Sequence, residues 1–149
     1  MSLIDKQRAA HWQALAQESH YHTAVAIREV LQEGNMDDAT AGLEELIDAL
    51  SRSERRALES HLKRLMLHVM KWKVQPERRS RSWRNTILGA RQEIARLQRR
   101  MPSLNRRVIE EDWDEFVELA RLEAEGEMNL DIPPLTLTWQ EVFEDEYAL

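Results

Sequence analysis

Apolar residues recur every three or four positions along most of this chain, and few residues interrupt the pattern. Leu58, Leu62, Leu65, Val69 and Trp72 show this spacing over one stretch. Such a period places the apolar side chains on one face of an α-helix. Only 4 glycines and 4 prolines occur among the 149 residues, so few positions break a helix. The sequence therefore predicts an all-α protein.

The first two helix boundaries follow from residues that end or cap helices. We expect a first helix over residues 5–32, because Gly34 and Asn35 tolerate the left-handed backbone that ends helices. A second helix is expected to begin near Asp37, whose carboxylate can cap free backbone amides. The residues expected to face inward from this second helix are Leu43, Leu46, Ile47 and Leu50.

The later helices have similar markers. Ser51 and Glu54 have the spacing of a capping box, which predicts the start of a third helix. Pro76 should end that helix, because proline pushes the preceding residue out of helical geometry. Apolar spacing predicts a fourth helix over residues 83–101 and a fifth over residues 104–126.

These elements predict an antiparallel bundle of four to five long helices with a short C-terminal capping helix. We expect one helical domain over residues 1–149, with the bundle over 1–130 and a proline-containing connector and terminal helix over 131–149. Residues 138–141 form a second capping box at the start of that terminal helix. We expect the tail to lie across the bundle with Trp139 as its anchor.

Composition excludes several classes of protein. The chain has no cysteine, so disulfides, thiolate metal sites and cysteine nucleophiles are excluded. No apolar run approaches the roughly 20 residues that a membrane-spanning helix needs. The first residues lack the pattern of a signal peptide. We therefore expect a cytoplasmic protein with no membrane contact and no cofactor.

Basic and acidic residues are separated along the chain. Residues 71–107 hold 12 basic and 2 acidic residues, whereas residues 108–149 hold 1 basic and 14 acidic residues. A basic segment followed by an acidic one is typical of a nucleic-acid-binding surface with an acidic tail. It is equally typical of two oppositely charged elements that pack together. The sequence leaves both interpretations open.

Several uncommon residues recur in order in the segments LSRSERR (50–56), LHVMKW (67–72), QPERRSRSW (75–83) and MPSL (101–104). In these segments the chain resembles a bacterial family known as domain of unknown function 29. The resemblance covers roughly residues 20–147, and by its name that family has no assigned activity. It implies a helical fold and a bacterial origin, and it supplies no catalytic residues. This chain departs from the family pattern at Gly42, where the family tends to have asparagine, and at Ser51, where it usually has glycine.

The corner between the third and fourth helices is the first candidate site. Arginine can hold phosphate oxygens in pairs, tryptophan can stack on bases, and a helix start offers free amides. Trp72 and Trp83 belong to the core stripes, however, and the arginines can pair with carboxylates of neighbouring helices. The residues of this candidate anion or nucleic-acid site are Lys73, Arg78, Arg79, Arg81 and Arg84.

Two histidines form a weaker candidate for metal binding. His61 and His68 lie two helical turns apart on one face, and Glu44 or Glu45 could complete a site across a bundle. His20 or His22 could serve as a third imidazole ligand. The glutamate that precedes histidine by three residues in di-iron bundles is absent, because leucine stands at both such positions. We therefore assign no metal.

A ribonuclease site is a third possibility. Arg55 and Arg56 precede His61 by six and five residues, a spacing found in small helical bundles of bacterial toxins and antitoxins. Such a site uses histidine as general acid or base and arginine to hold phosphate. The polar residue that usually follows the arginine is missing, since Ala57 follows Arg56.

The leading hypothesis is a bundle that binds another protein or itself, without catalysis. Nucleic-acid or phosphate binding at the basic corner is the first alternative, and a metal-dependent or RNA-cleaving enzyme is the second. If a site exists, we expect its centre to be a polar hub of residues that lie near helix ends or match the family's motif. The hub consists of Glu45, Glu54, His68, Lys71, Arg81 and Trp83.

Overall fold

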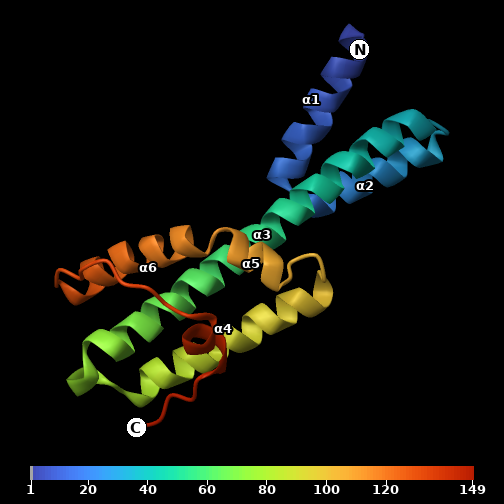
Figure 1. Ribbon diagram of the computed structural model, residues 1–149. Helices are drawn as coiled ribbons and strands as arrows, with labels where there is room; N and C mark the ends of the chain where they lie inside the picture. Colours follow the sequence, from blue (N-terminus) through green and yellow to red (C-terminus); the bar gives the residue numbers. More distant parts are fainter. Residues whose placement is uncertain (1) are drawn as a thin grey trace. The chain divides into compact units, whose positions relative to one another are not determined.

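The structure is a computed structural model that describes residues 2–149 (Figure 1). The described residues form helices, turns and an extended segment, with no strand, which confirms the all-α prediction. The chain divides into two compact units, residues 1–54 and residues 55–149. The expected single domain over residues 1–149 stays a prediction.

The first unit contains α1 (Leu3–Glu18), α2 (His20–Gln32) and the first part of α3 (Met36–Val74). The prediction of one helix over residues 5–32 is wrong, because the chain is extended at Ser19 (φ −158°, ψ 120°). The Ser19 hydroxyl accepts a hydrogen bond from the His22 amide at 3.1 Å. A serine in this position caps the second helix better than it continues the first.

The core of the first unit is built from small residues around one tryptophan. Trp12 is buried, and its Nε1 donates a hydrogen bond to Asp38 Oδ1 at 2.8 Å. Gly42 lies against it: a Cβ built at Gly42 would be 2.8 Å from Ile27 Cγ1 and 2.9 Å from Trp12 Cδ2. The absence of a side chain at this position therefore lets α3 approach the other two helices.

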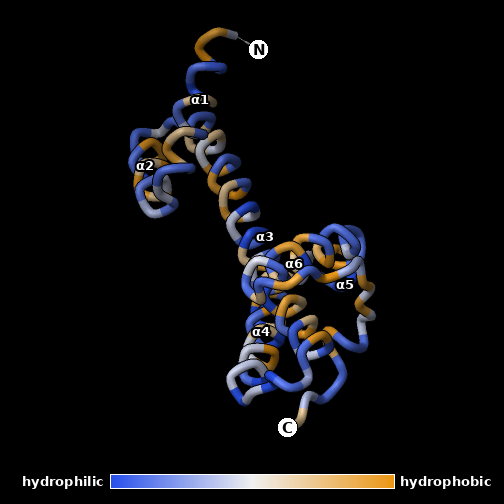
Figure 2. Tube along the Cα trace, turned by 90° about the vertical axis from the view of Figure 1, so that its left-hand side faces the viewer, coloured by the Kyte–Doolittle hydropathy of each residue, from blue (hydrophilic) through white to orange (hydrophobic). Residues whose placement is uncertain are grey.

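Helix α3 is continuous, so the predicted break at Ser51 is wrong. Ser51 lies inside the helix, where backbone amides already bond to carbonyls one turn earlier and need no cap. Three residues expected to face inward, Leu43, Ile47 and Leu50, are instead exposed. Figure 2 shows hydrophobic and hydrophilic residues recurring along each helix, as expected for amphipathic helices.

The second unit contains the rest of α3, the short 3₁₀ turn η1 (Pro76–Arg78) and α4 (Arg81–Arg100). α3 ends before Pro76 as predicted, and α4 runs antiparallel to it (Figure 1). The Ser80 hydroxyl caps α4 by accepting from the Trp83 amide at 3.2 Å.

The predicted fifth helix is two helices, α5 (Arg106–Glu111) and α6 (Trp113–Met128). Asp112, with φ −115° and ψ 24°, leaves helical geometry between them. Asn129 then ends α6 in the left-handed conformation (φ 50°), which asparagine tolerates better than most residues. Both ends of α6 therefore depend on short polar residues that sequence periodicity does not reveal.

The C-terminal tail packs onto the second unit. Ile132, Leu137 and Val142 are buried in its core. The tail ends in a single π-helical turn, η2 (Gln140–Glu144), closed by a hydrogen bond from the Asp145 amide to the Gln140 carbonyl at 2.8 Å. The docked tail agrees with the sequence prediction, although Trp139, its expected anchor, is only half-buried.

The predicted capping box at the tail is present. The Glu141 amide donates to Thr138 Oγ1 at 3.1 Å, and the Thr138 amide donates to Glu141 Oε1 at 3.0 Å. Glu141 Oε2 also lies 2.6 Å from Lys73 Nζ. Burial raises the pKa of Glu141, but the bonds from Lys73 and Thr138 outweigh it and hold this pKa below its ordinary value.

Arginine side chains hold the tail by its backbone. Arg91 donates to the carbonyls of Val142 and Asp145 at 2.8 Å each and to that of Glu141 at 3.3 Å. The Tyr147 hydroxyl donates to the Glu141 carbonyl at 2.5 Å. Burial raises the pKa of Tyr147 to about 12, despite the neighbouring Arg91 charge.

Candidate anion-binding groove

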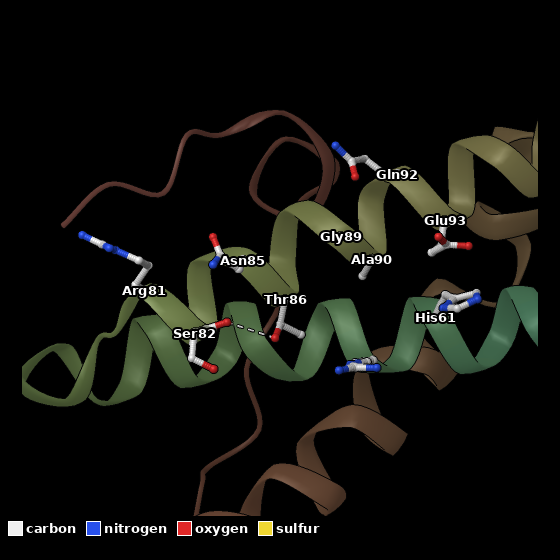
Figure 3. A pocket seen from close by; sticks show the side chains of 10 residues that line it. His61, Arg81, Ser82, Asn85, Thr86, Gly89, Ala90, Gln92 and Glu93 are labelled. Atoms are coloured by element: carbon white, nitrogen blue, oxygen red, sulfur yellow. Dashed lines mark hydrogen bonds between the residues drawn. The ribbon is translucent and has the colours of Figure 1, made fainter.

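A polar groove of about 640 Å³ lies between α3 and α4 in the second unit (Figure 3). Two residues of α3 and eight of α4 form its walls. Those residues are His61, Arg64, Arg81, Ser82, Asn85, Thr86, Gly89, Ala90, Gln92 and Glu93.

The groove exists because the face of α4 that borders α3 carries small side chains. Ser82, Thr86 and Ala90 are spaced four residues apart, so they share this face, and all three point toward α3 (Figure 3). The Thr86 hydroxyl donates to the Ser82 carbonyl at 3.0 Å and so stays within its own helix. A Cβ built at Gly89 would meet no atom within 4 Å. The groove is therefore open space that larger residues would fill.

Cationic groups line both walls. Arg81 extends from the first turn of α4 at one end, and His61 lies opposite Glu93 at the other (Figure 3). Arg64 joins them from α3. Within residues 2–149, neither Arg64 nor Arg81 has a side-chain hydrogen bond or a carboxylate at ion-pair distance. Glu93, the carboxylate of the groove, is paired with Arg96 at 3.5 Å.

The five residues of the predicted anion site separate into two groups. Lys73 pairs with Glu141 of the tail, and Arg79 donates from Nε to the Trp72 carbonyl at 2.8 Å. Arg78, Arg81 and Arg84 make no ion pair with any residue that the structure describes. The basic segment is thus partly neutralised by the acidic segment and partly unpaired.

Both tryptophans of the corner are engaged in packing. Trp72 is buried, with the Arg79 guanidinium 5.0 Å from its ring centre and the Tyr147 ring 5.4 Å away. Trp83 is half-buried, and Lys71 Nζ lies 5.8 Å from its ring centre. The buried Trp72 ring therefore presents no open face of the kind that stacks on a base, and the Trp83 ring is partly covered.

The predicted polar hub is distributed over the two units. Glu45 and Glu54 belong to the first unit, and the other four residues belong to the second. Lys71 contacts Trp83 and pairs with Glu127 at 2.5 Å. Arg81 lines the groove, whereas His68 borders a separate pocket. Lys71 lies beside Trp83 and its charge acts on His68, so these three residues are neighbours, and the hub as a site stays a prediction.

The two histidines of the second unit also have different surroundings. His68 Nδ1 lies 2.9 Å from the Arg64 carbonyl. Burial lowers the pKa of His68; the hydrogen bond to Arg64 opposes this and the Lys71 charge reinforces it. His61 lines the groove, and neither Arg55 nor Arg56 is among the residues that form its walls. Among residues 2–149, no three His, Asp or Glu side chains are grouped so that they could hold a metal ion.

Sequence reasoning missed most of the groove. It selected Arg81 and His61, but not Arg64, Asn85 or Gln92. The available signal was the four-residue repetition of small residues on α4, which a search for apolar spacing does not detect. Recognising it as a groove requires the position of α3, which no local pattern in the sequence supplies.

Comparison with protein-family models matches this chain to a family. The model described as domain of unknown function DUF29 matches residues 21–148. The chain belongs to the DUF29 family. The matched residues of this DUF29 chain include the whole groove and residues 131–148 of the tail, and they leave α1 outside.

No curated protein and no solved structure matches this DUF29 chain. Within the described residues, no helix combines the length and apolar character that crossing a bilayer requires.

Proposed function

We propose that this DUF29 chain is a binding module of the bacterial cytoplasm and that its α3–α4 groove holds an acidic segment of a partner protein. The observation that carries the proposal is the pair of unpartnered guanidinium groups, Arg64 and Arg81, on opposite walls of an open polar groove. Nearby cations such as Lys71 and Lys73 already have carboxylate partners. The groove arginines are therefore available for an external anion.

The groove suits an extended peptide. From Arg81 to Glu93, α4 rises about 18 Å, the length of roughly five extended residues. Guanidinium groups bind carboxylates with two parallel hydrogen bonds. The side chains of Asn85 and Gln92 each offer a donor and an acceptor, which match the groups of a peptide backbone. Gly89 leaves room for that backbone to approach α4 closely.

An acidic peptide is a better match than nucleic acid. Trp72 is buried and Trp83 is half-buried beside Lys71, so the corner offers little surface for base stacking. Residues 55–149 hold 17 basic and 17 acidic side chains, which gives little long-range attraction for a phosphate polymer.

Fluorescence anisotropy tests the proposal with a labelled ten-residue peptide of alternating Glu and Ser. Replacing both Arg64 and Arg81 with Gln should weaken binding about tenfold, because two charge-assisted pairs are lost. Gly89→Leu should weaken it comparably without a change in charge, because the new side chain fills the groove. Arg99→Gln, an exposed residue of α4 outside the groove, is the matched control and should change affinity less than about twofold.

Two results would contradict the proposal. Equal weakening by Arg99→Gln and by the double variant would show diffuse attraction instead of a groove. Tighter binding of a labelled single-stranded oligonucleotide, with a steep salt dependence and sensitivity to Arg78 and Arg84, would favour nucleic acid. Circular dichroism of each variant checks that the helices are retained.

A further inference from the structure

The first unit carries a row of exposed apolar residues along α3, which we name the α3 stripe. Leu43, Ile47 and Leu50 are four and three residues apart, so they share one face of the helix. Their exposed fractions are 48%, 56% and 42%, and Met36, one heptad before Leu43, is 63% exposed. Isolated exposed apolar residues are ordinary, but an aligned set is typical of an interaction site.

The packing within the first unit uses a different face of α3. Ala39, Gly42 and Ala49 are buried there, and Gly42 lies against Trp12 and Ile27. Consecutive residues are about 100° apart around a helix, so Gly42 and Leu43 belong to different faces. The α3 stripe is therefore a second apolar face, which the described residues leave exposed.

An acidic row runs beside the α3 stripe. Asp37, Glu44 and Asp48 each directly follow a residue of the stripe, so they form a parallel row on the neighbouring face. All three are exposed, and none makes an ion pair in the part of the chain that the structure describes. Residues 1–54 together hold 4 basic and 10 acidic side chains. Any partner that covers the stripe therefore meets a negative border.

We propose that the α3 stripe docks a basic amphipathic helix of a partner protein. The apolar residues of such a helix cover the stripe, and its bordering Lys or Arg residues pair with the acidic row. A second copy of this chain is a poorer match, because its stripe has the same acidic border and two acidic units repel each other. This surface belongs to the first unit and does not depend on the groove.

The test uses the full chain and a labelled helical peptide of about 14 residues, with Leu on one face and Lys elsewhere. Replacing both Leu43 and Ile47 with Ser should weaken binding about tenfold, because apolar contact is lost. Glu44→Gln with Asp48→Asn should weaken it about threefold and flatten its salt dependence, because the paired charges are lost. The fold should tolerate both changes, because all four side chains are exposed.

Matched controls separate this surface from others. Leu119 and Leu122 are exposed on α6 in the second unit at 47% and 52%, and replacing both with Ser should leave binding within about twofold. A peptide of the same composition with its leucines scattered, and one with Glu in place of Lys, should bind at least about tenfold more weakly. The Arg64 and Arg81 double variant should bind the basic peptide normally, which distinguishes this proposal from the groove.

Three results would overturn the inference. Equal loss of binding in the Leu119 and Leu122 variant would mean general hydrophobic adhesion. Unchanged binding in the Leu43 and Ile47 variant would place the peptide elsewhere. Concentration-dependent dimers in sedimentation velocity, abolished by the Leu43 and Ile47 substitutions, would identify a second copy as the occupant.

Discussion

The two units of this chain pack their helices with different side chains. In the first unit the buried residues other than Trp12 are small: Ala16, Thr23, Ala39, Gly42 and Ala49. In the second, large aliphatic residues of four helices and the tail form one cluster around α3. Small residues let helices approach closely but bury little apolar area, and apolar area is the main source of folding free energy. The first unit should therefore be less stable and less tolerant of added volume.

The units also use polar groups differently. In the first, one side-chain pair, Trp12 and Asp38, links α1 to α3, with Arg8 Nε also 3.2 Å from the Asp38 carboxylate. In the second, arginine side chains donate hydrogen bonds to backbone carbonyls of the tail, which is mostly extended. Arg91 donates to carbonyls of η2, and Arg121 donates to the Ile132 carbonyl. The second unit therefore depends on a few arginines to supply hydrogen-bond donors to the backbone carbonyls of the tail.

The largest expected effect comes from Arg91→Ala. It removes the donor to the carbonyls of Val142 and Asp145, while the Glu141 carbonyl keeps the Tyr147 hydroxyl. Hydrogen bonds to charged groups contribute about 1.5–3 kcal/mol each at most sites. We expect the free energy of unfolding of the second unit to fall by about 2–4 kcal/mol. Urea unfolding measures this loss. Hydrogen exchange in residues 129–149 should become faster than in the parent chain, while exchange in the first unit should stay the same.

Arg96→Ala is the matched control for Arg91. It removes an arginine of the same helix whose pair with Glu93 is exposed, and such pairs contribute roughly 0–1 kcal/mol. If both variants lost the same stability, the backbone contacts of Arg91 would not hold the tail.

An intermediate effect is expected from Gly42→Ala in the first unit. The added Cβ would lie closer than 3.0 Å to both Ile27 and Trp12. Such overpacking costs about 1–3 kcal/mol, which exceeds the gain of about 1 kcal/mol in helix propensity. Thermal unfolding followed by hydrogen exchange in α1 and α2 should show the loss.

Gly126→Ala in α6 gives the opposite expectation. A Cβ there meets no atom within 4 Å, so only the propensity gain applies. The two substitutions are chemically identical, and equal stability changes would contradict the difference in packing between the units.

The smallest effect concerns pH. Because burial lowers the pKa of His68 below 6.5, the unfolded chain takes up the proton first as pH falls. This residue should therefore cost no stability well above pH 6.5, and the second unit should lose stability as pH falls from about 6.5 toward the lowered pKa of the folded state. His68→Gln should reduce this loss below about pH 7. If His68→Gln had the same pH dependence of unfolding as the parent chain, the lowered pKa of the half-buried His68 imidazole would be contradicted.

Local signals predicted local features of the fold. Pro76 and the capping box of Thr138 and Glu141 act within one turn, and both were placed correctly. Ser19 also caps a helix, but it lacks the glutamate three residues later that makes a capping box, and the break there was missed. Ser51 has that glutamate and still lies inside a helix. A capping box therefore permits a helix start without requiring one.

Features that depend on tertiary packing were not predictable. Leu43, Ile47 and Leu50 match a core stripe by period, but the adjoining face with Gly42 is buried instead. Periodicity shows that a face is apolar and does not show what covers it. The groove has the same origin, because Arg64 and the α4 residues are distant in sequence and meet only when α3 and α4 pack.

The docked tail has a consequence for synthesis on the ribosome. Ile132, Leu137 and Val142 complete the core of the second unit, and Tyr147 closes it beside Arg91. The helices from α3 to α6 are translated before these residues. Until about residue 147 has left the ribosome, the apolar faces of these helices therefore remain partly uncovered. A transcript truncated in this last stretch would yield a chain with exposed apolar helix faces, which chaperones bind and proteases degrade.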